Sequence, residues 1–123
     1  MKQAIVIVDH GSRRAEANAA LEEVALLIRR ARPDAIVRVA HMDLVPPTVA
    51  EAFDACVAEG AGEVIVHPYF VSPGNHSMQD IPRIVREAAA RHPGVAARIT
   101  EPLGVHPNIA EVILERVRDA RKL

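Results

Sequence analysis

The segment that most constrains the fold is residues 4–8, an uninterrupted apolar run rich in β-branched side chains. Such a run predicts a strand that is buried on both faces, and strands of that kind lie in the middle of parallel sheets. Residues 63–70 have the same apolar character and predict a second central strand. Residues 35–43 and 95–100 also have strand-like patterns, but each contains an arginine, which favours a place at the edge of the sheet.

A helical pattern follows each predicted strand, so that strands and helices alternate along the chain. The first pattern places Leu21 and Ala25 on one helix face, and a capping box of Thr48 and Glu51 begins the second. This alternation predicts a parallel sheet with helices on both faces. Right-handed crossovers then predict the strand order 2-1-3-4, a flavodoxin-like topology, in a single α/β domain that spans residues 1–123.

The two remaining helices are predicted from their first turns and their apolar stripes. Asp80 is expected to be the N-cap of the third helix, with Pro82 in its first turn. The fourth helix follows a loop at residues 102–107. Its apolar side chains are expected to face the core, and they are Ile109, Val112, Ile113 and Val117.

Composition narrows the classes of function. The formal charge is −1, so no basic field favours nucleic-acid binding. Cys56 is the single cysteine, which excludes an intrachain disulfide and a cysteine-based cluster within one chain. It lies on an apolar helix face and is predicted to be a small buried hydrophobe. We see no signal peptide or membrane span in the sequence, and we therefore expect a cytoplasmic protein that does not bind a membrane.

Histidines follow both predicted central strands. His10 comes directly after the first strand, and His76 lies in the loop after the third, beyond a Pro73–Gly74 turn. Ligands of such sheets bind beyond the carboxyl ends of the strands where the strand order reverses, which is here between strands one and three. Imidazole is both a metal ligand and a general base near neutral pH, so the pair predicts one pocket for either chemistry. The alternative interpretation is that each is a loop histidine bonded to the backbone.

Other polar residues border the same point of the sheet. Asp43 ends the second strand and is either an oxygen ligand or proton acceptor, or a residue that caps a turn. Ser12 and Arg13 precede a helix, where backbone N–H groups can hold an anion. His67 is expected to be buried and hydrogen-bonded within its strand. The remaining histidines are His41 beside Asp43, His92 in a structural place at a helix end, and His106 at a pocket rim.

Four segments together resemble one family, the short, single-domain sirohydrochlorin chelatases of class II. They are DHGSRR with Asn18, AHMDLVPPTVAEAF, HPYFVSPGNHSMQDIP and EPLGVHPNIAEVI, and the resemblance covers roughly residues 5–117. Members of this family insert Co2+ or Fe2+ into the tetrapyrrole sirohydrochlorin, for siroheme or cobalamin. The resemblance implies a half-size chelatase fold that works as a homodimer, without a tightly bound cofactor, redox chemistry or nucleotide.

The resemblance also assigns roles to residues. It implies that His10 and His76 bind the incoming metal and accept the pyrrole protons. Asp43 stands where the family usually has Glu, as a third metal ligand. The residues of these segments are most similar to those of members that insert iron, so iron is the expected metal and cobalt the alternative. A non-enzymatic metal or tetrapyrrole carrier with the same fold is the competing function. Candidates for binding the macrocycle are Ser12, Arg13, Tyr69 and Phe70.

Overall fold

The computed structural model describes residues 1–72 and 74–123 and, for residues 75–77, only the course of the helical backbone. Four parallel strands form one sheet in the order β2-β1-β3-β4. Their bounds are Gln3–Asp9 for β1, Ile36–His41 for β2, Glu63–Pro68 for β3 and Ala96–Ile99 for β4. The predicted strand order is therefore confirmed, and the strands that contain Arg38 and Arg98 are the edges.

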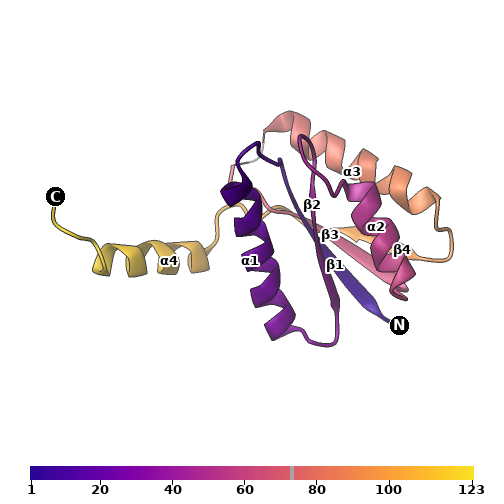
Figure 1. Cartoon of the computed structure of the whole chain (residues 1–123), viewed down its shortest axis with the longest axis horizontal. Helices are drawn as coiled ribbons and strands as arrows, with labels where there is room; N and C mark the ends of the chain where they lie inside the picture. Colours follow the sequence, from indigo (N-terminus) through magenta and orange to yellow (C-terminus); the bar gives the residue numbers. More distant parts are fainter. Residues whose placement is uncertain (73) are drawn as a thin grey trace.

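Four helices alternate with the strands: α1 (Ala15–Ala31), α2 (Val49–Ala58), α3 (Asn75–Ala90) and α4 (Pro107–Arg118). Figure 1 shows α1 on one side of the sheet and the pair α2 and α3 on the other. The capping box at the start of α2 is formed as expected, because Thr48 Oγ1 accepts from Glu51 N and Glu51 Oε1 accepts from Thr48 N. Helix α1 covers one face of the sheet and α2 with α3 the other, each through apolar side chains.

The sheet separates two apolar clusters. On the side of α2 and α3, β1 contributes Val6 and Val8, which are fully buried with Phe53 and Ile81. On the side of α1, Ile7 packs in a cluster with Leu21, Ala25, Val37 and Val39. Because successive side chains of a strand point to opposite faces, a central strand must be apolar throughout, which explains the run at residues 4–8. Cys56 is buried in the first cluster, as predicted.

Helix α3 begins earlier than the sequence predicts. Its N-cap is Gly74, and Asp80 and Pro82 both lie inside the helix. Asp80 was expected to cap the helix, but its carboxylate instead lies 3.7 Å from Arg83 in an i,i+3 pair on the helix surface. Residues 75–79 include no proline or β-branched side chain, so their sequence allows another turn of helix before Asp80. The predicted core face is confirmed, since Ile81 and Val85 are buried.

The expectation that α4 faces the core is wrong. None of its residues is buried, and Val112, Ile113 and Val117 have exposed fractions of 51%, 56% and 62%. Figure 1 shows α4 projecting from the body of the domain rather than lying against the sheet. An amphipathic pattern predicts that a helix has an apolar face, but it does not say which molecule covers that face. No helix in the described part of the chain is long and apolar enough to span a membrane.

Candidate functional site

The turn after β1 carries His10 and is fixed from both ends. Asp9 Oδ1 accepts a hydrogen bond from Gly11 N at 2.9 Å, which closes the turn across His10. Asn18, on the first turns of α1, accepts from Ser12 N at 3.0 Å and donates to Ser12 O at 2.7 Å. The turn is therefore held by side chains of its own strand and of the following helix, while His10 itself is exposed.

The end of β2 runs alongside this turn. Met42 N donates to Asp9 O at 2.9 Å and Asp43 N donates to His10 O at 3.0 Å, so the two chain segments stay paired beyond the sheet. Gly11 has a φ of +88°, and a Cβ atom there would lie 2.1 Å from Asp43 O. Only glycine suits this close approach of two backbones.

Replacing Gly11 by alanine is therefore expected to destabilise the fold by roughly 2–3 kcal/mol, because both the left-handed φ and the contact with Asp43 O become strained. Urea unfolding would measure the change. Gly94→Ala is the matched control, since a Cβ atom at Gly94 would meet nothing within 4 Å. Its effect should stay within about 0.5 kcal/mol. Equal stability of the two variants would contradict the close packing of this turn.

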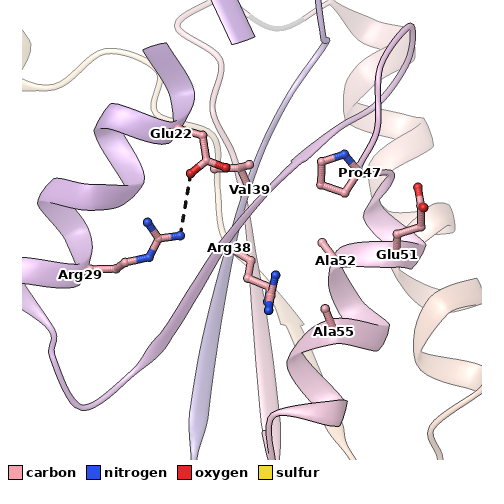
Figure 2. A pocket seen from close by; sticks show the side chains of 8 residues that line it. All are labelled: Glu22, Arg29, Arg38, Val39, Pro47, Glu51, Ala52 and Ala55. Atoms are coloured by element: carbon pink, nitrogen blue, oxygen red, sulfur yellow. Dashed lines mark ion pairs between the residues drawn. The ribbon is translucent and has the colours of Figure 1, made fainter. Parts of the chain in front are cut away.

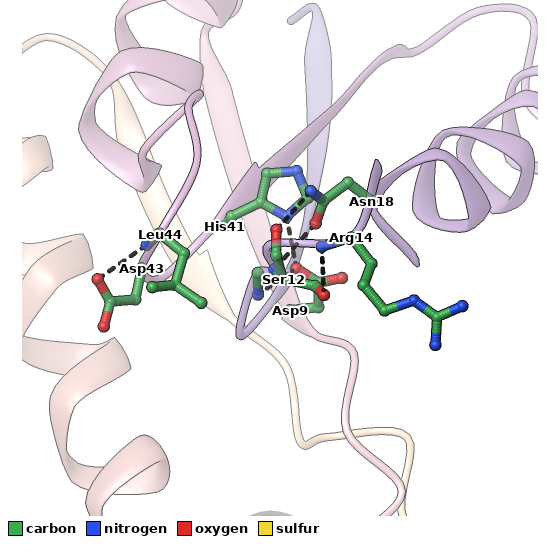
Figure 3. Close-up of polar contacts among 8 residues, drawn as sticks. Asp9, Ser12, Arg14, Asn18, His41, Asp43 and Leu44 are labelled. Atoms are coloured by element: carbon green, nitrogen blue, oxygen red, sulfur yellow. Dashed lines mark hydrogen bonds and ion pairs between the residues drawn. The ribbon is translucent and has the colours of Figure 1, made fainter. Parts of the chain in front are cut away.

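Asp43 serves as a turn residue in this structure. Its Oδ1 accepts from Leu44 N at 2.8 Å, and Leu44 has a φ of +73°. Figure 3 shows the carboxylate directed at Leu44, away from the pair formed by Asp9 and His41. Asp43 remains exposed, and its main chain is bonded to that of His10. The turn-capping interpretation is thus observed, and a metal-ligand role would need the side chain to change its partner.

The end of β3 provides the aromatic residues of the site. The rings of Phe70 and His10 have centroids 4.6 Å apart, tilted by 47°. Phe70 belongs to the apolar cluster under α2 and α3, whereas Tyr69 packs with the cluster under α1. The two predicted macrocycle-binding aromatics therefore point to opposite sides of the sheet, and only Phe70 lies beside His10. Tyr69 instead lines a cavity of about 430 Å3 with Leu103, His106, Asn108, Ile109 and Val112.

The placement of the His76 side chain lies outside the described part of the structure. Its backbone belongs to the first turn of α3, which follows β3 as the sequence predicts. The hypothesis that His10 and His76 share one pocket therefore stays a prediction. Among the residues whose side chains are described, no three His, Cys, Asp or Glu residues are grouped closely enough to hold a metal ion.

Ser12 and Arg13 form the rim of the same turn. Ser12 Oγ accepts from Arg14 N at 3.0 Å, and the Arg13 side chain is exposed. Arg14 lies 3.9 Å from Glu16 in an exposed ion pair. The two predicted contacts for an anionic substrate group thus lie next to His10 in the chain, at the start of α1. Figure 3 shows Ser12 and Asn18 close to Asp9 and His41.

The remaining histidines have other partners. His67 Nδ1 lies 2.7 Å from Thr100 Oγ1, and partial burial lowers the pKa of His67 below its usual value. His92 lies 2.7 Å from Asp54 and stacks on Phe53 with ring centroids 5.8 Å apart, a structural role that agrees with the sequence. His106 is the N-cap of α4, where its Nδ1 accepts from Asn108 N. None of the three is described within bonding distance of His10.

A buried cysteine and a pocket at the edge of β2 lie apart from the residues predicted to form the site. Burial raises the pKa of the Cys56 thiol to about 11, so it stays protonated at neutral pH and is no thiolate ligand. A small pocket of about 90 Å3 lies at the outer edge of β2, and Figure 2 shows the side chains that line it. They include the ion pair of Glu22 and Arg29 at 3.9 Å, together with Arg38 and Glu51. Its charges are mixed, and it contains none of the residues predicted to bind metal or tetrapyrrole.

Sequence reasoning missed one contact at the site. His41 is 4% exposed, and its Nδ1 lies 2.6 Å from Asp9 Oδ1. The parallel register places Asp9 directly opposite His41, because both end adjacent strands. A carboxylate and an imidazole at matching strand ends are a signal that could have predicted this pair.

Fold and site together define a four-stranded parallel α/β domain with an exposed histidine at the strand-order reversal. The CbiX family model matches residues 4–120, and the chain belongs to this family. A sirohydrochlorin ferrochelatase of Arabidopsis thaliana chloroplasts is 42% identical over 93% of this chain and 51% of its own. A sirohydrochlorin cobaltochelatase of Methanothermobacter thermautotrophicus is 31% identical over 97% and 93%.

A solved structure has the same fold. The sirohydrochlorin chelatase SirB from Bacillus subtilis subspecies spizizenii, in complex with cobalt, superposes with a TM-score of 0.82 at 32% identity. The match covers 97% of this chain and 51% of that one. The present chain thus spans about half the length of several relatives that it matches, and nearly the full length of others. The expected half-size chelatase fold is confirmed.

Proposed function

We propose that this protein inserts a divalent metal ion into sirohydrochlorin. The observation that carries the proposal is the exposed His10, held on a fixed turn at the strand-order reversal of a CbiX-family fold. Relatives of about twice the length of this chain and relatives of similar length are both named sirohydrochlorin chelatases. Incubating the protein with sirohydrochlorin and metal, and following the change in absorbance, tests the proposal. A carrier with the same fold would bind the metal or sirohydrochlorin, but the absorbance change of metal insertion would not occur.

The reaction needs a ligand for the metal and a base. Two pyrrole N–H protons leave the macrocycle as the M2+ ion enters, so the charge of the ring centre is conserved. Neutral imidazole is a ligand that suits Fe2+ and Co2+, and it also accepts protons near neutral pH. We assign these roles to His10 and His76, and a supporting ligand role to Asp43. Because Fe2+ persists in reducing compartments, a cytoplasmic location suits the reaction.

The substrate is planar and carries carboxylates at its edge. We assign the carboxylate contacts to Ser12, Arg13 and the N–H groups at the start of α1, where the helix dipole favours negative charge. Phe70 packs against the His10 ring, but its side chain is 7% exposed, so it can present little apolar surface to the macrocycle. Tyr69 would reach a macrocycle only from the cavity on the α4 side.

Iron is the metal that we expect this chain to insert faster. Product formation from sirohydrochlorin should occur with both Fe2+ and Co2+, because imidazole binds either ion, and the rate with Fe2+ should be the higher one. Anaerobic assays at equal free metal concentration would compare the two rates. Conversion confined to Co2+ would make this a cobaltochelatase and refute the expectation.

We further propose that the working unit is a homodimer. The apolar stripe of α4 is defined as Ile109, Val112, Ile113 and Val117; Ile109 is partly covered, and the other three are more than half exposed. It continues into the cavity of about 430 Å3 beside Tyr69 and Leu103. Relatives of twice the length supply a second segment of similar size within one chain. A second copy of this chain is the simplest equivalent, since two-fold assembly is the commonest form of association.

A further inference from the structure

Beyond the residues assigned above, we propose that Asp9 and His41 are positioning residues that hold the His10 turn in its working geometry. The proposal rests on the proposed metal insertion for its catalytic consequence, but its geometric part stands without it. The pair lies at the ends of adjacent strands, β1 and β2, directly under the turn. His41 Nδ1 lies 2.6 Å from Asp9 Oδ1.

The pair is largely removed from water. His41 is the polar side chain that the described residues bury most completely, at 4% exposure, and the Asp9 side chain is 23% exposed. Removing such groups from water costs free energy, and an apolar pair of similar volume would often give equal or greater stability. Fold stability alone therefore does not explain this pair.

The pair is also hydrogen-bonded to the backbone next to His10. The same oxygen, Asp9 Oδ1, accepts from the His41 ring and from Gly11 N at 2.9 Å. One carboxylate oxygen thus links a buried ring to the backbone on the far side of His10. Because the carboxylate only accepts, His41 Nδ1 must carry the hydrogen. Without the ring, the carboxylate would lose the contact that sets its direction, and the bond that closes the turn would weaken.

The pair is poorly placed for a direct role, because the His41 ring is only 4% exposed. His41 Nδ1 donates to Asp9 and is not available as a metal ligand through that atom. The His41 main chain is also fixed, since its N–H donates to Pro47 O at 2.8 Å. Asp43, two residues further on, donates to His10 O. Both links therefore reach the backbone on either side of His10, one through Asp9 and the His41 ring and the other through the main chain that follows His41.

The test compares two replacements of His41 in the full chain. In His41→Leu the volume is kept and the donor is lost, whereas in His41→Asn an amide N–H remains near the position of Nδ1. Asp9→Ala is a further variant at a partly exposed site, and it remains informative if the leucine variant does not fold. The first readout is the imidazole NMR signal of His10, assigned with His10→Ala, with the signal of His92 as internal reference.

We expect the His10 signal to shift or broaden in His41→Leu and Asp9→Ala, and to stay near its wild-type position in His41→Asn. The His92 signal should not change. With sirohydrochlorin and Fe2+, kcat should fall about 10- to 100-fold in the first two variants at an unchanged KM for the tetrapyrrole. The asparagine variant should keep kcat within about threefold.

Two results would overturn the proposal. One is an unchanged His10 signal in folded Asp9→Ala or His41→Leu, and the other is an asparagine variant that is as impaired as the leucine variant. A wild-type protein that converts no sirohydrochlorin with either metal would refute the proposed function instead. The NMR comparison would then still decide the geometric role of the pair.

Discussion

Replacing His10 by alanine is expected to lower kcat/KM for metal insertion by at least about a hundredfold. This is the lower end of the rate enhancement that a general base typically contributes. The loss of a metal-binding imidazole adds to this effect. The fold should be unaffected, because His10 is exposed and lies outside both apolar clusters. Absorbance assays with sirohydrochlorin and Fe2+ or Co2+ would measure the rate, and circular dichroism would check the fold.

The comparison needs a second active-site variant and a control. His76→Ala should cause a loss of the same order, since the same roles are assigned to both histidines. His92→Gln is the control, because His92 contacts Asp54 and Phe53 between α2 and α3, away from the His10 turn. Its kcat/KM should stay within about twofold of the wild type. A His10→Ala protein that retains more than about a tenth of the activity would contradict the assignment.

The sheet could be predicted because burial dictates its sequence. The run at residues 4–8 is apolar on both sides since helices cover both faces of β1, and the edge strands could accept Arg38 and Arg98. The start of α3 could not be predicted in the same way. Asp80 and Pro82 are typical of a first helical turn, yet α3 begins at Asn75 and contains Pro82 in its interior, where a proline has no N–H to donate to the preceding turn.

Part of the site could be predicted from the strand order. Strand order places the residues that follow β1 and β3 at one edge, which brought Phe70 next to His10. The direction of a side chain depends on the pleat, so consecutive residues such as Tyr69 and Phe70 separate to opposite faces. The pair of Asp9 and His41 depends on the exact register of β1 and β2, which no single segment encodes.

Substitutions in the apolar stripe of α4 are expected to have a second large effect, which is the loss of association between two copies of the chain. If the protein forms the proposed dimer, replacing both Ile113 and Val117 by glutamine is expected to convert it to a monomer, because these side chains are 56% and 62% exposed in the single chain. Each copy loses two apolar contacts, and a fully buried aliphatic side chain contributes roughly 1.5–3 kcal/mol. The dimer dissociation constant should therefore rise by at least about a thousandfold.

The polar face of the same helix provides the matched control. Glu111→Gln with Glu115→Gln introduces the same two side chains on the same turns, but away from the stripe. Glutamine has a higher helix propensity than valine or isoleucine, so a weaker helix cannot account for a loss of association. Sedimentation at micromolar concentration should find the control as a dimer. The interface of a stable dimer is expected to bury at least about 1,000 Å2 in total.

The monomeric variant also decides whether one copy can act alone. If the second copy completes the tetrapyrrole site, kcat/KM should fall together with the dimer fraction and recover at higher protein concentration. The stripe adjoins the cavity beside Tyr69, so a dimer formed through α4 would also cover this side of the sheet. A wild-type chain that sediments as a monomer and inserts metal at the full rate would show that a single domain suffices, and α4 would then need another partner.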